Sequence, residues 1–189
     1  MALKERPRVL VVDREGEATK SLLAFLRAHD LEVVWARDGE SGYNALDATR
    51  VDCLVTELRI HRIDGMALLR RAHERNPEVC AVLIAEGADV DMAVEAMRRG
   101  AADFQVKPVN HEKLLAVLRQ GLGRQALAAR VAEMEAQLDE RFGVERLTGR
   151  SRAIVRVMEQ VRHIASTRAT VLIEGETGTG KGLVAQAVH

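Results

Sequence analysis

The stretch Arg8-Val-Leu-Val-Val-Asp13 decides the fold of this chain. A short apolar run without alternation is typical of a strand that is buried on both faces of a parallel sheet. Similar runs recur at 31–36, 53–56, 79–84 and 103–106. Segments with helical periodicity separate these runs, and the alternation predicts an α/β fold. We therefore expect a five-stranded parallel sheet covered by helices on both faces.

The intervening segments carry apolar residues at helical spacing. Helices are predicted at 18–28, 41–48, 65–74, 90–99 and 111–119. Two glycines follow the last of these helices, Gly121 and Gly123, and interrupt its periodicity. Glycine weakens a helix interior, so this pair predicts a hinge or kink.

Composition limits the classes of protein that fit. The 189 residues suffice for one ordinary domain and part of another. The 28 basic and 28 acidic residues balance, so no net field favours DNA or an anionic membrane. No apolar run has the length of a membrane span or forms a signal-peptide core. We expect a cytoplasmic protein without a membrane partner, and two buried free thiols, Cys53 and Cys80, without a metal site.

Four residues mark the expected functional site. In parallel α/β sheets, ligands gather at the carboxyl ends of the strands. Those ends carry Asp13, Glu57, Ala85 and Lys107 in this sequence. We therefore expect these side chains to lie together at one edge of the sheet.

Three separated segments resemble the receiver domain of two-component response regulators. They are 10–15 (LVVDRE), 52–65 (DCLVTELRIHRIDG) and 93–108 (AVEAMRRGAADFQVKP), and they occur in order at the right strand ends. The resemblance covers roughly the first two-thirds of the chain and implies the flavodoxin-like, five-stranded receiver fold. It also implies a site in which an acidic pair binds magnesium and an Asp accepts a phosphoryl group. Asp13, Lys107 and the switch aromatic Phe104 match that pattern.

Three positions depart from the family pattern. Arg14 occupies the second acidic position, Glu57 the phosphoacceptor position, and Ala85 the position of a hydroxyl residue. A guanidinium repels a divalent cation, and alanine offers no oxygen ligand. One interpretation is a closed ion cluster of Arg14, Glu57, Asp13 and Lys107, in which Arg14 replaces the metal and Glu57 imitates a phosphorylated Asp. The alternative is a solvated charge patch at the loop rim.

A helical linker follows the receiver-like region. Its apolar residues have the 4-3-4 spacing of a coiled-coil seam: Leu127, Val131, Met134 and Leu138. The spacing favours a homodimer formed through the linker, and the alternative is a single amphipathic helix packed on the protein.

The last segment, 147–189, resembles the start of the AAA+ ATPase domain of sigma-54-dependent transcription activators. Its glycine-rich loop is a phosphate-binding pattern between an apolar strand-like run, 171–173, and a helical segment, 183–188. The candidate nucleotide-binding residues are Gly175, Glu176, Thr177, Gly178, Thr179, Gly180, Lys181 and Gly182. Gly182 departs from the family's Glu and from the Ser or Thr of phosphate loops generally.

The order of these parts resembles the NtrC-type response regulators. It predicts a receiver-like domain at 1–120, a linker helix at 121–146 and the N-terminal part of the ATPase domain at 147–189. We expect the regulatory part of a longer activator that controls oligomerisation of the ATPase, without being an enzyme itself. ATP and magnesium belong to the full-length family, and sigma-54 RNA polymerase and DNA would bind only through parts outside this chain.

Other functions stay open at this point. A sensor kinase or another regulatory protein would be the upstream partner. The chain could also be a stand-alone dimerising partner that inhibits a full-length relative, or a response regulator that is still phosphorylated. An active nucleotide hydrolase is weakly supported, because hydrolysis needs metal ligands and a positioned water beyond the phosphate loop.

Overall fold

The computed structural model describes residues 6–87, 90–142, 152–165, 167, 170–176 and 179–188. Within it the chain divides into two compact units, Met1–Leu127 and Ala128–His189. Each unit is described by itself.

The first unit contains the predicted five-stranded parallel sheet. Its strands are β1 (Arg8–Val12), β2 (Glu32–Ala36), β3 (Cys53–Glu57), β4 (Cys80–Ala85) and β5 (Asp103–Val106). The strand order is β2-β1-β3-β4-β5, and all neighbouring strands are parallel. This order and the parallel pairing confirm the receiver fold expected from the sequence.

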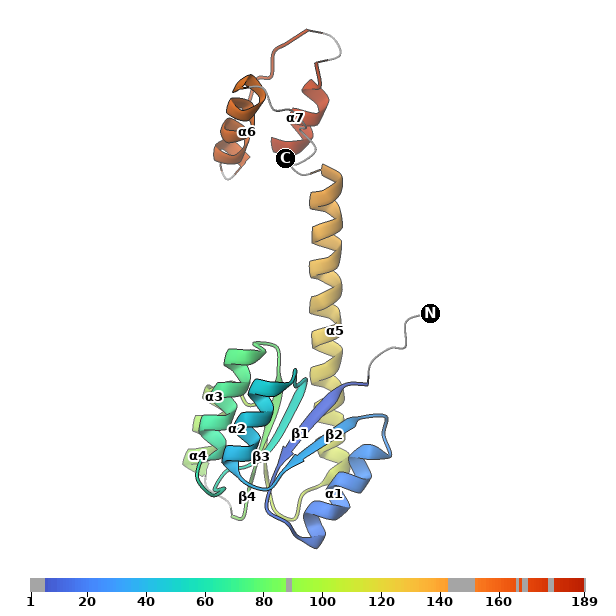
Figure 1. Ribbon diagram of the computed structural model, residues 1–189, viewed down its shortest axis with the longest axis vertical. Coiled ribbons are helices and arrows are strands. Elements are labelled where there is room, and N and C mark those ends of the chain that lie inside the picture. The colour runs from blue at the N-terminus through green and yellow to red at the C-terminus, as the bar shows by residue number, and fades with distance from the viewer. Residues whose placement is uncertain are drawn as a thin grey trace. The chain divides into compact units, whose positions relative to one another are not determined.

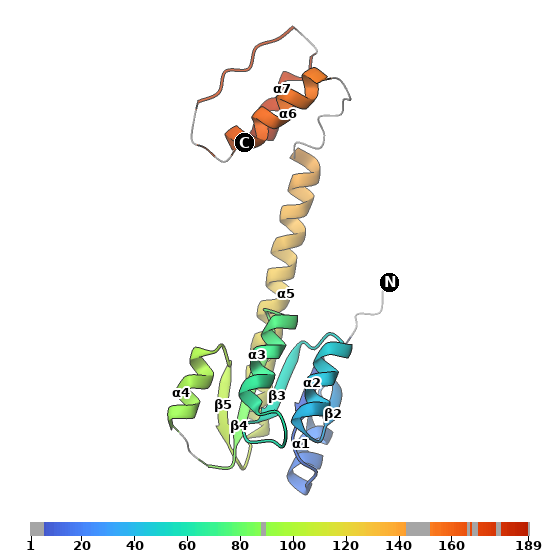
Figure 2. The ribbon, with the colours of Figure 1, turned by 60° about the vertical axis from the view of Figure 1, so that its left-hand side comes forward.

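Helices cover both faces of the sheet. They are α1 (Glu17–Arg27), α2 (Gly39–Ala48), α3 (Gly65–Arg75), α4 (Val90–Arg98) and α5 (His111–Phe142). Figures 1 and 2 show α1 and α5 on one face and α2, α3 and α4 on the other. Two of the caps explain where helices begin, because the carboxylates of Asp38 and Asp64 accept hydrogen bonds from the first turns of α2 and α3.

Each face of the sheet has its own apolar core. Alternate residues of β1 point to opposite faces, so Val9 and Val11 pack with α1 and α5, while Leu10 and Val12 pack with α2, α3 and α4. These four side chains are fully buried. Each contributes roughly 1.5–3 kcal/mol relative to an exposed position, and together they hold the strand ends in register.

The prediction of a hinge at Gly121 and Gly123 is wrong. Helix α5 runs without interruption from His111 to Phe142. Gly121 serves a different purpose, because a Cβ atom there would lie 2.4 Å from both Cβ and Sγ of Cys80. The glycine therefore allows α5 to approach β4 closely, whereas a Cβ atom at Gly123 would meet nothing within 4 Å.

The second unit contains two further helices, α6 (Arg152–Ala165) and α7 (Lys181–Val188). Residues 171–173 form no strand, although the sequence predicts one. A strand is stabilised by pairing with a neighbour, and the described residues of this unit contain no strand that could pair with it. The sequence interpretation also missed α6, whose apolar stripe includes Ile154, Met158 and the buried Val161.

None of the described helices is both long enough and apolar enough to cross a membrane.

Candidate functional site

The carboxyl ends of four strands bring the predicted site residues together. Asp13 and Arg14 directly follow β1, Glu57 is the last residue of β3, and Lys107 directly follows β5. Ala85 ends β4. Parallel strands end at the same edge of the sheet, so residues up to 94 positions apart in sequence meet there.

Asp13 is a buried carboxylate with three hydrogen-bond donors. Its Oδ1 accepts from the backbone N–H of Arg14 at 2.8 Å and from Nζ of Lys107 at 3.1 Å. Its Oδ2 accepts from the hydroxyl of Thr19 at 3.2 Å. The indole N–H of Trp35 donates to the backbone carbonyl of Asp13 at 2.9 Å. These contacts fix the turn after β1 and supply the partners that a buried charge needs.

Glu57 is also buried, with a side chain only 1% exposed. Arg14 donates two hydrogen bonds to it, from Nε to Oε2 at 3.2 Å and from Nη2 to Oε1 at 2.9 Å. Lys107 adds a third, from Nζ to Oε1 at 3.2 Å. A paired guanidinium fork of this kind is a strong, directional interaction. The carboxylate that occupies the phosphoacceptor position is therefore already engaged by two cations.

Glu86 is a fifth member that the sequence interpretation missed. Its Oε1 lies 3.2 Å from Nζ of Lys107 and 3.6 Å from Nη2 of Arg14. Its place directly after Ala85, at a strand end that the sequence analysis had already singled out, could have revealed it. We use the name ion cluster for Asp13, Arg14, Glu57, Glu86 and Lys107. Three acidic groups and two basic groups give it a formal charge of −1.

The pKa values of the cluster favour its charged state. Burial alone would raise the pKa of Glu57, but the hydrogen bonds and charges of Arg14 and Lys107 outweigh burial and lower it. Burial would likewise lower the pKa of Lys107, yet its contacts with Asp13 and Glu57 raise it. The hydrogen bond and charge of Glu57 raise the pKa of Arg14. Arg14 and Lys107 therefore remain cationic beside the ionised carboxylate of Glu57 at neutral pH.

The residues present do not fit the magnesium ion of the family pattern. Magnesium takes oxygen ligands in near-octahedral array. Here the Asp13 and Glu57 oxygens already accept hydrogen bonds from cationic side chains, and Arg14 contributes a positive charge in place of a carboxylate. Among the described residues, no group of three or more His, Cys, Asp or Glu side chains could hold a metal ion.

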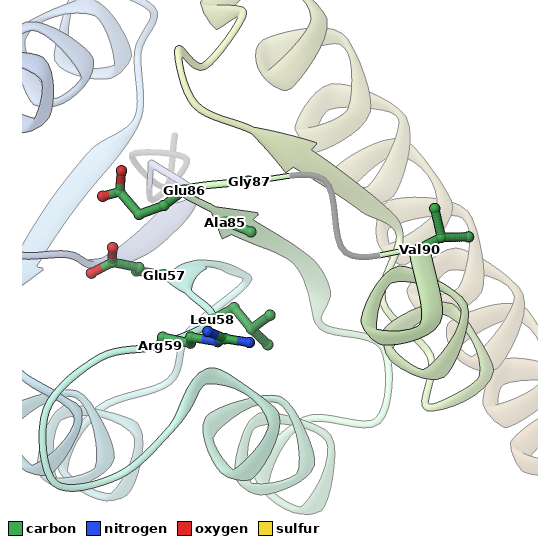
Figure 3. A pocket seen from close by; sticks show the side chains of 7 residues that line it. All are labelled: Glu57, Leu58, Arg59, Ala85, Glu86, Gly87 and Val90. Atoms are coloured by element: carbon green, nitrogen blue, oxygen red, sulfur yellow. The ribbon is translucent and has the colours of Figure 1, made fainter.

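A pocket of about 420 Å³ lies beside the ion cluster. Figure 3 shows the carboxylates of Glu57 and Glu86 on one side of it and Val90, at the start of α4, on the other. Ala85 lies between the two carboxylates and Val90, and it contributes only a methyl group to the pocket wall. The remaining lining residues are Leu58, Arg59 and Gly87. The hydroxyl that the family pattern places at this strand end is therefore missing from the pocket wall.

The glycine-rich loop lies in the second unit. Nζ of Lys181 donates to the backbone carbonyl of Gly175 at 2.8 Å, and the hydroxyl of Thr179 donates to that of Glu176 at 2.7 Å. Gly180 has φ +86°, which favours glycine at that position. Helix α7 begins at Lys181. These contacts tie the described part of the loop to the start of α7.

Two further predicted loop residues, Thr177 and Gly178, lie outside the described residues. At Gly182, in the first turn of α7, a Cβ atom would meet nothing within 4 Å. Space therefore does not explain the departure from the family pattern at this position.

Comparison with known families assigns both regions. Residues 9–119 match the model of the response regulator receiver domain, and residues 147–189 match that of the sigma-54 interaction domain. The chain belongs to the NtrC-type sigma-54-dependent response regulators. This assignment confirms the resemblance on which the sequence interpretation relied.

Relatives with the same combination of regions include curated regulators. The C4-dicarboxylate transport transcriptional regulatory protein DctD of Pseudomonas aeruginosa is 36% identical over 96% of this chain and 40% of its own length. The transcriptional regulatory protein ZraR of Escherichia coli O157:H7 is 32% identical over 96% of this chain and 40% of its own length. This NtrC-type chain therefore spans about two-fifths of the curated relatives it matches.

A solved structure is similar to this chain over most of the length of this chain. The crystal structure of NtrX from Brucella abortus in complex with ATP is 30% identical, with a TM-score of 0.61. The match covers 97% of this chain and 40% of that chain.

Two other predicted features of this NtrC-type chain lie away from the ion cluster. Phe104, in β5, is half-buried and packs against the apolar core under α2, α3 and α4. The seam residues Leu127, Val131 and Met134 are 66%, 47% and 57% exposed on α5. Leu138 belongs to α5, but its side chain lies outside the described ones. The receiver therefore does not cover the three described seam residues.

Proposed function

We propose that this chain is the regulatory part of a sigma-54-dependent activator whose receiver works without phosphorylation of an acidic residue. The observation that carries the proposal is the pair of hydrogen bonds from Arg14 to Glu57. They place a cation on the carboxylate that would have to attack the phosphodonor.

Three features of the site oppose phosphoryl transfer. The Glu57 carboxylate would have to give up hydrogen bonds from Arg14 and Lys107 before it could attack. The charge of a transferred phosphoryl group is normally neutralised by metal ions, and the residues here do not fit magnesium. Ala85 supplies no hydroxyl to the transferred group. Each feature raises the barrier, and together they favour a permanently unphosphorylated site.

The ion cluster supports a fixed signalling state. Glu57 extends one methylene further than the Asp of the family pattern, and Lys107 contacts its carboxylate at 3.2 Å. A negative group is therefore held permanently near Lys107, as a phosphoryl group would be transiently. Lys107 directly follows β5, and α5 begins four residues later at His111. A change in the contacts of Lys107 would thus be transmitted to α5, and so to the linker, through the short segment between β5 and α5.

The linker helix would pass that state on through dimerisation. Leu127, Val131 and Met134 expose apolar side chains at coiled-coil spacing on α5. A second copy of the chain would bury them, because an isolated amphipathic helix gains stability mainly by packing. This proposal assigns residues 121–146 to the linker and 147–189 to the ATPase region, after a receiver at 1–120.

The remaining partners follow from the relatives. NtrX has been solved in complex with ATP, and we propose that Gly175–Gly182 contribute to ATP and magnesium binding in the whole protein. Sigma-54 RNA polymerase and DNA would be partners of the whole protein. A regulatory protein, or a sensor kinase that acts by binding, would supply the upstream signal. The phosphate loop by itself does not make this segment an ATPase.

A phosphorylation assay tests the proposal. The chain is incubated with magnesium and acetyl phosphate, and its intact mass is measured after desalting at low temperature. We expect no gain of a phosphoryl group. A stoichiometric acyl phosphate mapped to Glu57 or Asp13 would contradict the proposal, whereas a receiver with an intact site, treated in parallel, verifies that the donor is active.

A further inference from the structure

The two cysteines of the chain lie directly opposite each other on neighbouring strands. Cys53, at the start of β3, is paired in register with Cys80, at the start of β4. Both side chains belong to the apolar core under α1 and α5 and are 0% and 1% exposed. Both are free thiols. The pair lies at the amino ends of the strands, opposite the edge that carries the ion cluster.

Helix α5 closes over this pair. The Cys80 thiol donates a hydrogen bond to the backbone carbonyl of Val117, with Sγ and O 3.7 Å apart. One turn further along, Gly121 lies so close that any Cβ atom there would overlap Cys80. After another turn, Nε2 of Gln125 donates to the carbonyls of Asp52 at 2.8 Å and Glu78 at 2.7 Å. Asp52 immediately precedes β3, and Glu78 lies two residues before β4. Gln125 therefore hydrogen-bonds α5 to the segments that lead into both cysteine-bearing strands.

The two thiols have different environments. The side chains of Cys53 and Cys80 are hydrogen-bonded to each other, and this contact, with burial, raises the pKa of Cys53. The same contact lowers the pKa of Cys80, which burial opposes and the charge of Arg124 supports. Cys80 is also the thiol that α5 covers directly, through Val117 and Gly121, so it is the first sulfur that an oxidant meets when the helix moves. Thiolate character and access govern such reactivity.

We propose that Cys53 and Cys80 form an oxidisable dithiol site, which a peroxide converts into an intrachain disulfide when α5 lifts from β4. The Cys80 thiolate attacks one oxygen of the peroxide and breaks the O–O bond, which gives a sulfenic acid and releases hydroxide. The Cys53 thiol then attacks the Cys80 sulfur, and the sulfenic hydroxyl leaves as water. Overall, two thiols and one hydrogen peroxide give one disulfide and two waters, so the cysteines lose the two electrons that the peroxide gains.

The strand pairing supports closure of this disulfide. Neighbouring strands lie about 4.7–4.9 Å apart, inside the range of about 4.4–6.8 Å between Cα atoms that disulfides span. Both side chains already point to the same face of the sheet, from residues paired in register on neighbouring strands. Large backbone movement is therefore unnecessary, and access for the oxidant becomes the controlling step.

Access depends on α5, because the thiols are buried beneath it. A peroxide reaches Cys80 only after the segment from Val117 to Gln125 has moved. Formation of the disulfide also removes the thiol proton that bonds Val117, and so weakens the docking of α5. The disulfide would therefore form only when α5 has moved away from β4, and once formed it would favour that undocked position of the helix. This inference is independent of the phosphorylation proposal.

Mass spectrometry of the whole chain tests the disulfide. The chain is treated with hydrogen peroxide, unfolded in urea and alkylated with iodoacetamide. We expect both cysteines to escape alkylation and the intact mass to fall by two hydrogens, and dithiothreitol should restore both thiols. Full alkylation of both cysteines after peroxide treatment, or disulfides between separate chains, would overturn the proposal.

Variants distinguish the two thiols and the role of α5. C53S should stop at a Cys80 sulfenic acid that dimedone traps, whereas C80S should leave Cys53 unmodified. Q125A removes two hydrogen bonds that hold α5 and should speed disulfide formation about fivefold or more. E133A, which changes an exposed residue of the same helix, is the matched control. An unchanged rate in Q125A would overturn control by α5, and dimedone labelling at Cys53 instead of Cys80 would overturn the assigned order.

Discussion

The guanidinium of Arg14 holds the buried carboxylate of Glu57 through two hydrogen bonds, Nε to Oε2 at 3.2 Å and Nη2 to Oε1 at 2.9 Å. Glu57 is 1% exposed, while Arg14 is 61% exposed. The arginine therefore lies at the surface and covers the buried, negatively charged carboxylate of Glu57. This asymmetry distinguishes the ion cluster from a solvated surface patch, since two of its three acidic groups are buried.

Removing the Arg14 side chain should destabilise the receiver. R14A leaves Glu57 with Lys107 as its remaining cation and forfeits two charge-assisted hydrogen bonds. We expect a loss of about 1–2 kcal/mol in the free energy of unfolding, with the exposure of Arg14 limiting the effect. Urea denaturation measures it. K20A breaks an exposed ion pair with Glu17 and serves as the control, with a change of less than about 0.5 kcal/mol. Equal stability of R14A and K20A would contradict a structural role for the cluster.

Acid should weaken the cluster in a defined window. The pKa of Glu57 is lowered below its ordinary value of 4.5. Its ionised form therefore contributes stability that is complete above about pH 4.5 and is lost as the pH falls through the folded-state pKa. The variant E57Q cannot titrate at this position.

The measurement compares wild type and E57Q by urea denaturation across the acid range. The difference in unfolding free energy should be constant near neutral pH and should shrink below about pH 4.5, by at most about 1.4 kcal/mol per pH unit. A difference that grows on acidification would show that the pKa of Glu57 is raised instead.

Much of this architecture could be predicted from the residues themselves. The apolar runs at β1, β3 and β4 are buried on both faces, so their unbroken hydrophobicity gave the parallel sheet. The strand ends then located Asp13, Glu57 and Lys107 at one edge. The sequence did not determine whether these side chains would form buried ion pairs or remain solvated, because that depends on their conformation and burial in the fold.

Other features depended on contacts between distant segments. Gly121 looked like a helix breaker, because its partner Cys80 lies 41 positions away and only the fold brings the two together. The run 171–173 looked like a strand, because strand propensity does not show whether a neighbour is there to pair with it. Helix α6 is predictable from its own residues, because its apolar side chains recur at helical spacing.

Restoring the family pattern should restore phosphorylation. The triple variant R14D/E57D/A85T replaces the cation with a carboxylate, shortens the acceptor and supplies a hydroxyl. It should gain one phosphoryl group from acetyl phosphate in the presence of magnesium, and chelation of the metal should prevent the gain. Intact mass and acid-quenched peptide mapping detect the product at position 57.

The single variant E57D is the control for that experiment. It keeps Arg14 beside the acceptor and Ala85 at the end of β4, so we expect no more than trace phosphorylation. If E57D is phosphorylated as well as the triple variant, Arg14 and Ala85 do not block the chemistry, and the role assigned to Arg14 is wrong.

Dimerisation should depend on the exposed seam of α5. Replacing Leu127, Val131 and Met134 together by serine removes apolar side chains that are about half or more exposed in the single chain. Burial of such side chains contributes about 1 kcal/mol or more each, so the dimer dissociation constant should rise at least ~100-fold. Sedimentation equilibrium measures it.

Two further measurements complete the seam experiment. The stability of the receiver should be unchanged, because its apolar core does not include these three side chains. A variant with exposed Arg130 and Glu133 replaced by serine keeps the seam intact and should still dimerise. A monomeric wild-type chain at high concentration would refute the proposed seam.

The two glycines of α5 should respond in opposite directions to the same substitution. G121A places a Cβ atom 2.4 Å from Cβ and Sγ of Cys80. Helix α5 must then shift away from β4, and we expect a loss of about 1–3 kcal/mol despite the better helix propensity of alanine. At Gly123 a Cβ atom meets nothing within 4 Å, so G123A should stabilise the chain by about 0.5–1 kcal/mol through helix propensity alone. Thermal and urea unfolding of both variants measure these changes. The two substitutions are chemically identical and lie in the same helix, and they differ in the contact with Cys80. Stabilisation by both substitutions would show that α5 does not approach β4 as closely as the structure places it.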